Sequence, residues 1–166
     1  MNIPKMFEGA IARAITENAE LTDMPRIRTW QAIDAEGRWS TESDRVFPLI
    51  DIRTGPPRVS SDDGVTCLCN VTVLVGTHKD DDPTHGELSR YYEAIQSVLD
   101  SLYAQFRSGV AGSERNSFDA HIRDTEPASI VTVGGFEHGE PLDPYDDEGA
   151  QFIGMMFVIH FSRSDF

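Results

Sequence analysis

Apolar residues recur along the chain with two different spacings, and each spacing predicts a different kind of element. Near the N-terminus they repeat every three or four positions, which is typical of a helix with one buried face, and we expect this helix over residues 4–19. The same spacing, over a longer stretch, predicts a second helix over residues 84–107. Asp82 or Thr84 is expected to cap that helix, because either side chain can accept hydrogen bonds from its first free backbone N–H groups.

Strict alternation of apolar and other residues marks the expected strands. Residues 65–77 alternate throughout, which predicts a strand with one firmly buried face. Residues 129–134 and 150–163 are also strand-like. So is the segment 45–53, where Pro48 favours a position at the edge of the sheet or a β-bulge.

The other segments are expected to connect these elements. Residues 20–44 suggest a turn between two short extended pieces, and residues 108–127 are polar without clear periodicity. Residues 135–149 predict an acidic loop that contains two prolines. The element order, helix–strand–strand–helix–strand–strand, predicts an α+β fold in a single domain over residues 1–166. Its sheet is expected to be four-stranded and mostly antiparallel, with the two main helices packed on it.

The amino-acid composition and net charge exclude several classes of function for this chain. Of 166 residues, 39% are hydrophobic and 25% are charged, values typical of a globular domain. The formal net charge of −14 argues against a protein that binds nucleic acid or an anionic membrane surface, because binding to either needs Lys and Arg side chains. The longest apolar run, near residues 153–159, is far shorter than the ~20 residues of a membrane-spanning helix. No signal peptide is recognisable, so we expect a protein that is soluble and intracellular when made.

The two cysteines are expected to be structural. Cys67 and Cys69 lie two positions apart on a predicted strand, so their side chains point to the same face and suit neither a disulfide nor a zinc site. Small apolar residues on a buried face explain them better. Unpaired thiols indicate a reducing compartment.

One cluster between the predicted strand 65–77 and the second helix contains metal-ligand residue types. It could hold a divalent metal, which leaves open a small metal-dependent hydrolase that uses His78, Asp80, Asp82 and His85. The spacing fits no known metal-binding loop, and acids are common at a helix N-terminus, so a capped connector is the favoured interpretation. No nucleophile motif or phosphate-binding glycine loop is present. We therefore expect a protein that is not an enzyme and has no metal or cofactor.

Charged residues provide the candidate contact surfaces. Six acids and no Lys or Arg lie in the predicted acidic loop: Glu137, Glu140, Asp143, Asp146, Asp147 and Glu148. Such a loop is more typical of a contact surface than of a catalytic pair. Twelve of the fourteen basic residues are Arg, and Arg53 and Arg58 bracket the sequence TGPP. Because the guanidinium group pairs well with carboxylates, these two arginines are candidates for ion pairs between subunits.

The order of the elements resembles a known family. An amphipathic helix leads into a β-hairpin ending in VTVLVGTH, then come a short acidic connector, a long helix and a final hairpin. The long helix carries the pattern His85, Leu88, Tyr92, Ile95 and Leu99. From about Phe7 to Phe161, the chain resembles the small tail terminator or tail completion (minor tail) proteins of long-tailed bacteriophages. That family has no catalytic residues to compare.

The resemblance implies a structural protein of the virion that is assembled in the host cytoplasm. Its subunits would form a homo-oligomeric ring, commonly a hexamer, that caps the tail tube protein and meets the head-side connector protein. DNA would pass through without specific binding, and an acidic lumen would keep it from sticking. A neck or head-completion connector subunit is the alternative. The first helix, through Phe7 and Ile11, would contribute to the subunit interfaces together with Arg53, Arg58 and the acidic loop.

Overall fold

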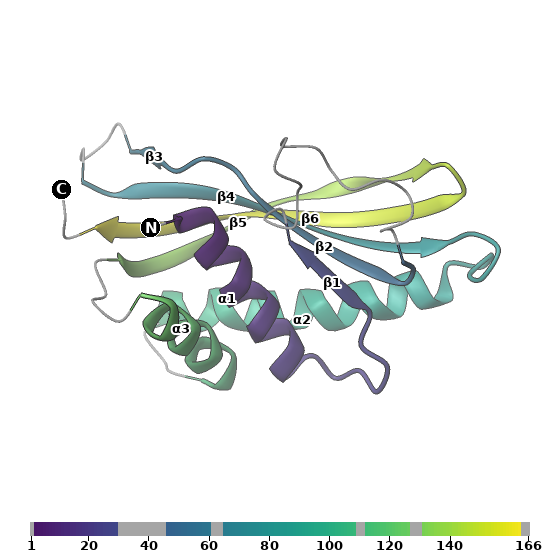
Figure 1. Ribbon diagram of the computed structural model, residues 1–166, viewed down its shortest axis with the longest axis horizontal. Coiled ribbons are helices and arrows are strands. Elements are labelled where there is room, and N and C mark those ends of the chain that lie inside the picture. Colours follow the sequence, from purple (N-terminus) through teal and green to yellow (C-terminus); the bar gives the residue numbers. More distant parts are fainter. Residues whose placement is uncertain (1, 30–45, 61–64, 109–111, 127–130, 164–166) are drawn as a thin grey trace.

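A twisted sheet with helices packed on one of its faces makes up the described part of the protein (Figure 1). The computed structural model describes residues 2–29, 46–60, 65–108, 112–126 and 131–163. The helices of these segments are α1 (Ile3–Asn18), α2 (Gly86–Ser108) and α3 (Ser113–Thr125). The strands are β1 (Arg26–Thr29), β2 (Leu49–Thr54), β3 (Arg58–Val59), β4 (Cys67–His78), β5 (Val131–Asp147) and β6 (Ala150–Arg163).

The described strands form one six-stranded sheet in the order β1-β2-β4-β6-β5, with the short β3 also paired to β4. All neighbours are antiparallel except β1 and β2, which run parallel. The predicted α+β class with a mostly antiparallel sheet is therefore confirmed. The prediction of four strands and two main helices is wrong, because the described segments also contain β1, β3 and α3.

The centre of the sheet is the antiparallel pair β4 and β6, which stay in register from Cys67 opposite Phe161 to His78 opposite Ala150. The alternation predicted for residues 65–77 is confirmed, since Cys67, Cys69 and the valines that follow at every second position are buried in the core. Neither cysteine forms a disulfide, and burial raises the pKa of Cys69 to about 12. An un-ionised thiol of this kind is inert, as expected for a structural residue.

Helix α1 begins where the Asn2 side chain accepts a hydrogen bond from the backbone N–H of Lys5, at 3.0 Å. Phe7 and Ile11 are fully buried inside the protomer. The Phe7 ring meets the edge of Phe161 with centroids 5.1 Å apart. These two residues of α1 thus belong to the core of their own subunit, and the expectation that they form a surface between subunits is corrected.

Helix α3 was not predicted, because its sequence offers only a thin apolar stripe. Its buried residues are Ser117, Phe118 and Ile122, and the rest of its surface is polar. Polar contacts complete its packing on α1: the Ser117 hydroxyl donates to Glu17 Oε2 at 2.6 Å, and Arg13 pairs with Asp124 at 2.9 Å. A helix held this way lacks the strong apolar periodicity by which helices are recognised in sequence.

Strand β5 replaces the predicted strand 129–134 and most of the predicted acidic loop 135–149. It continues to Asp147 and joins β6 through a tight turn at Glu148 and Gly149, both with positive φ. Three register shifts interrupt its pairing with β6. Because β5 lies at the edge of the described sheet, these bulges and the residues Pro141 and Pro144 are tolerated, whereas an interior strand would exclude them.

The edge position expected for the segment 45–53 is wrong. Strand β2 lies between β1 and β4, so it is an interior strand of the sheet. Pro48 immediately precedes the strand, and its missing N–H therefore costs no ladder hydrogen bond. The turn expected within residues 20–44 falls mostly outside the described residues.

The face of the sheet opposite the helices is also partly buried. Leu49, Leu74 and Phe152 are at most 5% exposed there. The Phe152 ring packs between Phe47, at 6.0 Å between centroids, and Tyr145, at 5.1 Å. The long hairpin thus has a small apolar cluster of its own, away from the main core.

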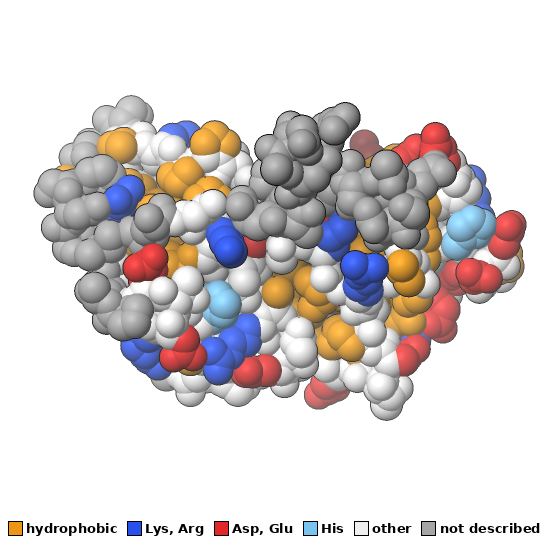
Figure 2. Space-filling view, in the orientation of Figure 1, with side chains coloured by type: hydrophobic (Ala, Val, Ile, Leu, Met, Phe, Trp, Pro, Cys, Tyr) orange, Lys and Arg blue, Asp and Glu red, His pale blue; other side chains and the backbone are white. Residues whose placement is uncertain are grey.

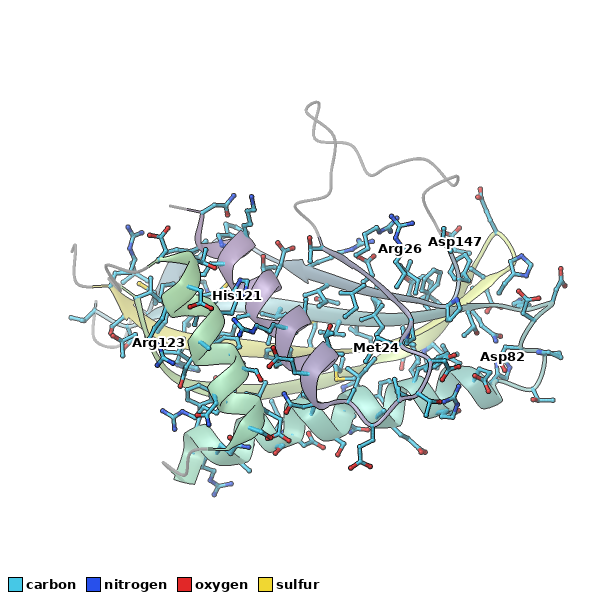
Figure 3. All side chains as sticks on the ribbon, turned by 60° about the horizontal axis from the view of Figure 1, so that its bottom comes forward. Met24, Arg26, Asp82, His121, Arg123 and Asp147 are labelled. Carbon is cyan, nitrogen blue, oxygen red and sulfur yellow. The ribbon has the colours of Figure 1, made fainter. Side chains whose placement is uncertain are left out.

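The contact between α1 and α3 depends on the absence of a side chain at Gly9. His121 of α3 lies between the two helices (Figure 3), and a Cβ at Gly9 would come within 2.4 Å of its Nε2. Burial, together with the charge of Arg13, lowers the pKa of His121, so the ring is held in its neutral form.

We predict that Gly9→Ala changes stability with opposite signs in two backgrounds. Alanine favours a helix over glycine by ~1 kcal/mol, but crowding against His121 should cost about 1–3 kcal/mol. The free energy of unfolding in urea should therefore fall in the wild-type background and rise in a His121→Ala background. A loss of equal size in both backgrounds would show that the two residues do not interact.

Candidate functional site

The Asp82 carboxylate organises the connection between β4 and α2. It is 4% exposed and accepts hydrogen bonds from the backbone N–H groups of Glu87, at 3.0 Å, and Leu88, at 2.9 Å. The Thr77 hydroxyl donates to it at 3.0 Å, and the Gln151 amide donates to the Asp82 carbonyl oxygen at 2.8 Å. Burial raises the pKa of Asp82, but these backbone and hydroxyl donors lower it by more, so it lies below its ordinary value.

This network makes Asp82, one member of the predicted cluster of His and Asp residues, the cap of α2. Of the two predicted capping residues, the structure selects Asp82, although α2 begins only at Gly86. His78 faces Asp80 at 3.7 Å, and Asp80 is largely exposed. Within the described ranges, no group of three or more His, Cys, Asp or Glu side chains could hold a metal ion. The Asp82 carboxylate, one of the groups that a metal-dependent hydrolase would use, already accepts hydrogen bonds from two backbone N–H groups and from the Thr77 hydroxyl.

The predicted acidic residues lie along the β5–β6 hairpin, chiefly toward its turn. That turn lies beside the β4–α2 connector, where the Lys79 N–H donates to the Gly149 carbonyl oxygen at 2.9 Å and Lys79 Nζ pairs with Asp146 at 2.7 Å. Figure 2 shows acidic side chains gathered at this end of the molecule. Asp143, Asp147 and Glu148 are exposed. We call this region, residues 143–148 of the hairpin with Asp80 and Asp81 of the connector, the acidic end.

The other predicted acids are placed differently. Glu137 lies farther from the turn, on the outer face of the sheet, where its carboxylate is 2.9 Å from Nε2 of His160. Glu140 lies in β5, and its side chain is outside the described part of the structure. The six acids therefore follow one hairpin but do not form one cluster.

Arg53 and Arg58, the predicted interface arginines, have separate surroundings. Arg53 Nη2 lies 3.0 Å from Asp51 Oδ2, and Arg28 approaches the same oxygen at 3.4 Å. Asp51 and Arg28 are both buried, whereas Arg53 is partly exposed. Arg58 is exposed on the short strand β3. Arg53 therefore stabilises a buried carboxylate of its own subunit, and Arg58 remains the accessible member of the pair.

The sequence does not predict the Arg28–Asp51–Arg53 cluster. Removing one partner of such a buried group costs several kcal/mol, roughly 3–5, because the remaining charge is left without compensation. One signal was available: Asp51 and Arg53 are two positions apart on a strand, so they share a face. Arg28 could not have been added, because its parallel pairing with β2 has no signature in the sequence.

No protein-family model matches the chain, and a search of curated proteins finds no significant match. In the described residues, no helix is both long and apolar enough to cross a membrane. Function must therefore be argued from the arrangement of side chains.

We predict that Asp82→Ala lowers the free energy of unfolding by about 2–4 kcal/mol at pH 7, because it leaves two helical N–H groups and the Thr77 hydroxyl without their acceptor. Asp81→Ala, at an exposed neighbouring carboxylate, is the matched control and should change stability by less than ~0.5 kcal/mol.

The Asp82 effect should also depend on pH. A carboxyl group with a lowered pKa in the folded state stabilises the fold above its unfolded pKa, about 3.9, and this contribution is lost as the pH falls through the folded value. The difference between wild type and Asp82→Ala, measured by urea unfolding, should therefore shrink in acid. A difference independent of pH down to full protonation would contradict the role of the charged cap.

Proposed function

We propose that this protein is a structural subunit of a bacteriophage virion that forms a ring, caps the tail tube and joins it to the head-side connector. The observation that carries the proposal is the acidic end, built from the β5–β6 turn and the β4–α2 connector. A ring that turns this end toward its opening would repel the phosphate backbone of DNA in transit. The resemblance in element order, described above, supports the same assignment.

The rest of the architecture is compatible with such a subunit. Helices α1, α2 and α3 share one core with the inner face of the sheet, so each subunit can fold by itself before it assembles. The sheet formed by the described residues has two different edges, β1 and β5, which suits contacts of the head-to-tail type. Contacts of that type close into rings when the rotation between subunits closes.

A neck or head-completion connector subunit is the second candidate. The same acidic end and the same sheet edges support it, and it differs only in the protein that the ring meets. Binding tests with tail tubes and with head-side connectors, done in parallel, separate the two candidates.

We predict that the purified protein forms closed rings as its concentration is raised, seen by electron microscopy and by light scattering. The rings should bind the ends of tail tubes and stop their growth. The proposal would be refuted if the protein stayed strictly monomeric and did not bind tail tubes. Binding only to head-side connectors would favour the second candidate.

We further predict that reversing the charge at the acidic end makes the ring retain DNA. Asp143→Lys with Glu148→Lys should add salt-dependent binding of duplex DNA in a mobility-shift assay, because two added cations near the phosphates release counterions. Glu20→Lys with Glu93→Lys makes the same change in charge at exposed positions on the helical side. Equal DNA binding by both variants would contradict an acidic end that faces the channel.

A further inference from the structure

A cleft between α2 and the edge strand β5 lies away from the acidic end's turn and from the buried arginine cluster. One face of α2 provides Tyr92, Gln96, Asp100 and Tyr103 to its wall. Strand β5 provides His138, and the buried side chains Met155 and Phe157 of β6 also line it. The positions 92, 96, 100 and 103 follow helical spacing, so they form one continuous stripe.

The polar groups of this cleft are held in place by contacts with each other. His138 lies over Tyr103 with ring centroids 4.2 Å apart, and its Nε2 is 3.3 Å from Asp100 Oδ1. Burial and the charge of Asp100 raise the pKa of Tyr92. The Asp100 carboxylate is therefore set among aromatic rings, one of its oxygens faces His138, and its side chain is half-exposed.

This chemistry suits an organic cation. Aromatic faces attract a cation through their negative quadrupole, and a carboxylate adds direct pairing. None of the described residues that line the cleft is Lys or Arg, and the imidazole of His138 contacts Asp100 Oδ1. A guanidinium group fits best, because it is planar, can stack on an aromatic ring and can donate to a carboxylate at the same time.

An arginine is available at the opposite edge of the same sheet. Arg26 begins β1, the other edge strand of the sheet as far as it is described, and its side chain is exposed. Figure 3 shows it reaching outward from the sheet. Among the described residues its guanidinium makes no ion pair. A cation at one edge and a cation-binding cleft at the other are complementary when copies associate head to tail.

We infer that the cleft between α2 and β5 binds the Arg26 side chain of a second copy of this chain. The guanidinium lies against the ring of Tyr103 and pairs with Asp100. This inference rests on the proposed ring and names the contact that joins neighbouring subunits.

The chemistry of the cleft is tested with a small probe on the Arg26→Glu variant, in which the cleft is not filled by a neighbour. N-acetylarginine methylamide should shift the NMR signals of Tyr103, His138 and Gln96, with a dissociation constant on the order of millimolar. The citrulline analogue, of similar shape but neutral, should bind at least about tenfold more weakly. Equal binding of the two probes, or no shift with either, overturns the assignment of a cation site.

The occupant is tested by exchanging charges across the contact. Arg26→Glu and Asp100→Arg should each weaken association about tenfold or more in sedimentation velocity, and the double variant should recover it. Arg123→Glu, at an exposed arginine of α3, is the matched control and should associate like the wild type. Circular dichroism checks that every variant is folded.

The outcomes separate this contact from the proposed function. If rings form equally well with Arg26→Glu, or if the double variant does not regain association, the contact is refuted but the proposed ring is not. If the cleft binds the arginine probe but neither Arg26→Glu nor Asp100→Arg weakens association, Arg26 is refuted as the occupant. A wild-type protein that stays monomeric at every concentration refutes both the contact and the ring.

Discussion

The antiparallel pairing of β4 with β6 is the interaction on which the rest of this structure depends. Because the two strands stay in register over their whole shared length, every second residue of each is directed to the same side. On that side α1, α2 and α3 find a continuous apolar surface, so one register decides where all three helices pack. A slip of β4 by one residue against β6 would turn Val73 away from the helices and place Thr72 beneath them.

The same pairing explains how an acidic, proline-bearing segment can be a strand. Once β6 is held by β4, its other edge offers a complete row of backbone groups to β5, which pairs with it despite three register shifts. The side chains of β5 therefore need not supply the driving force. Strand β5 therefore carries Asp143 and Asp147, with Glu148 in the turn that follows, to the acidic end on which the proposed function rests.

What could be predicted from the sequence follows from how each element is stabilised. Helices α1 and α2 and strand β4 bury one apolar face each, so the spacing of their apolar residues reveals them in the sequence. Their predicted boundaries lie within two residues of those in the structure. Helix α3 and strand β5 are held largely by neighbours and by polar contacts, which leave no period in the sequence. For the candidate site, the acids of the hairpin and the capping role of Asp82 were predictable. The Arg28–Asp51–Arg53 cluster and the cleft at Asp100 were not, because they depend on which strands are neighbours.

The two sheet edges also restrict how copies of this chain can meet. A flat, regular edge strand invites another strand to pair with it, and natural proteins block such edges with prolines and bulges. Strand β5 carries both devices, at Pro141 and Pro144 and at its register shifts. Continuous strand addition is thereby disfavoured at this edge, so an association there must use side chains. A cleft that holds one cation beside Asp100 provides a directional contact of that kind and leaves the backbone of the edge strand unpaired.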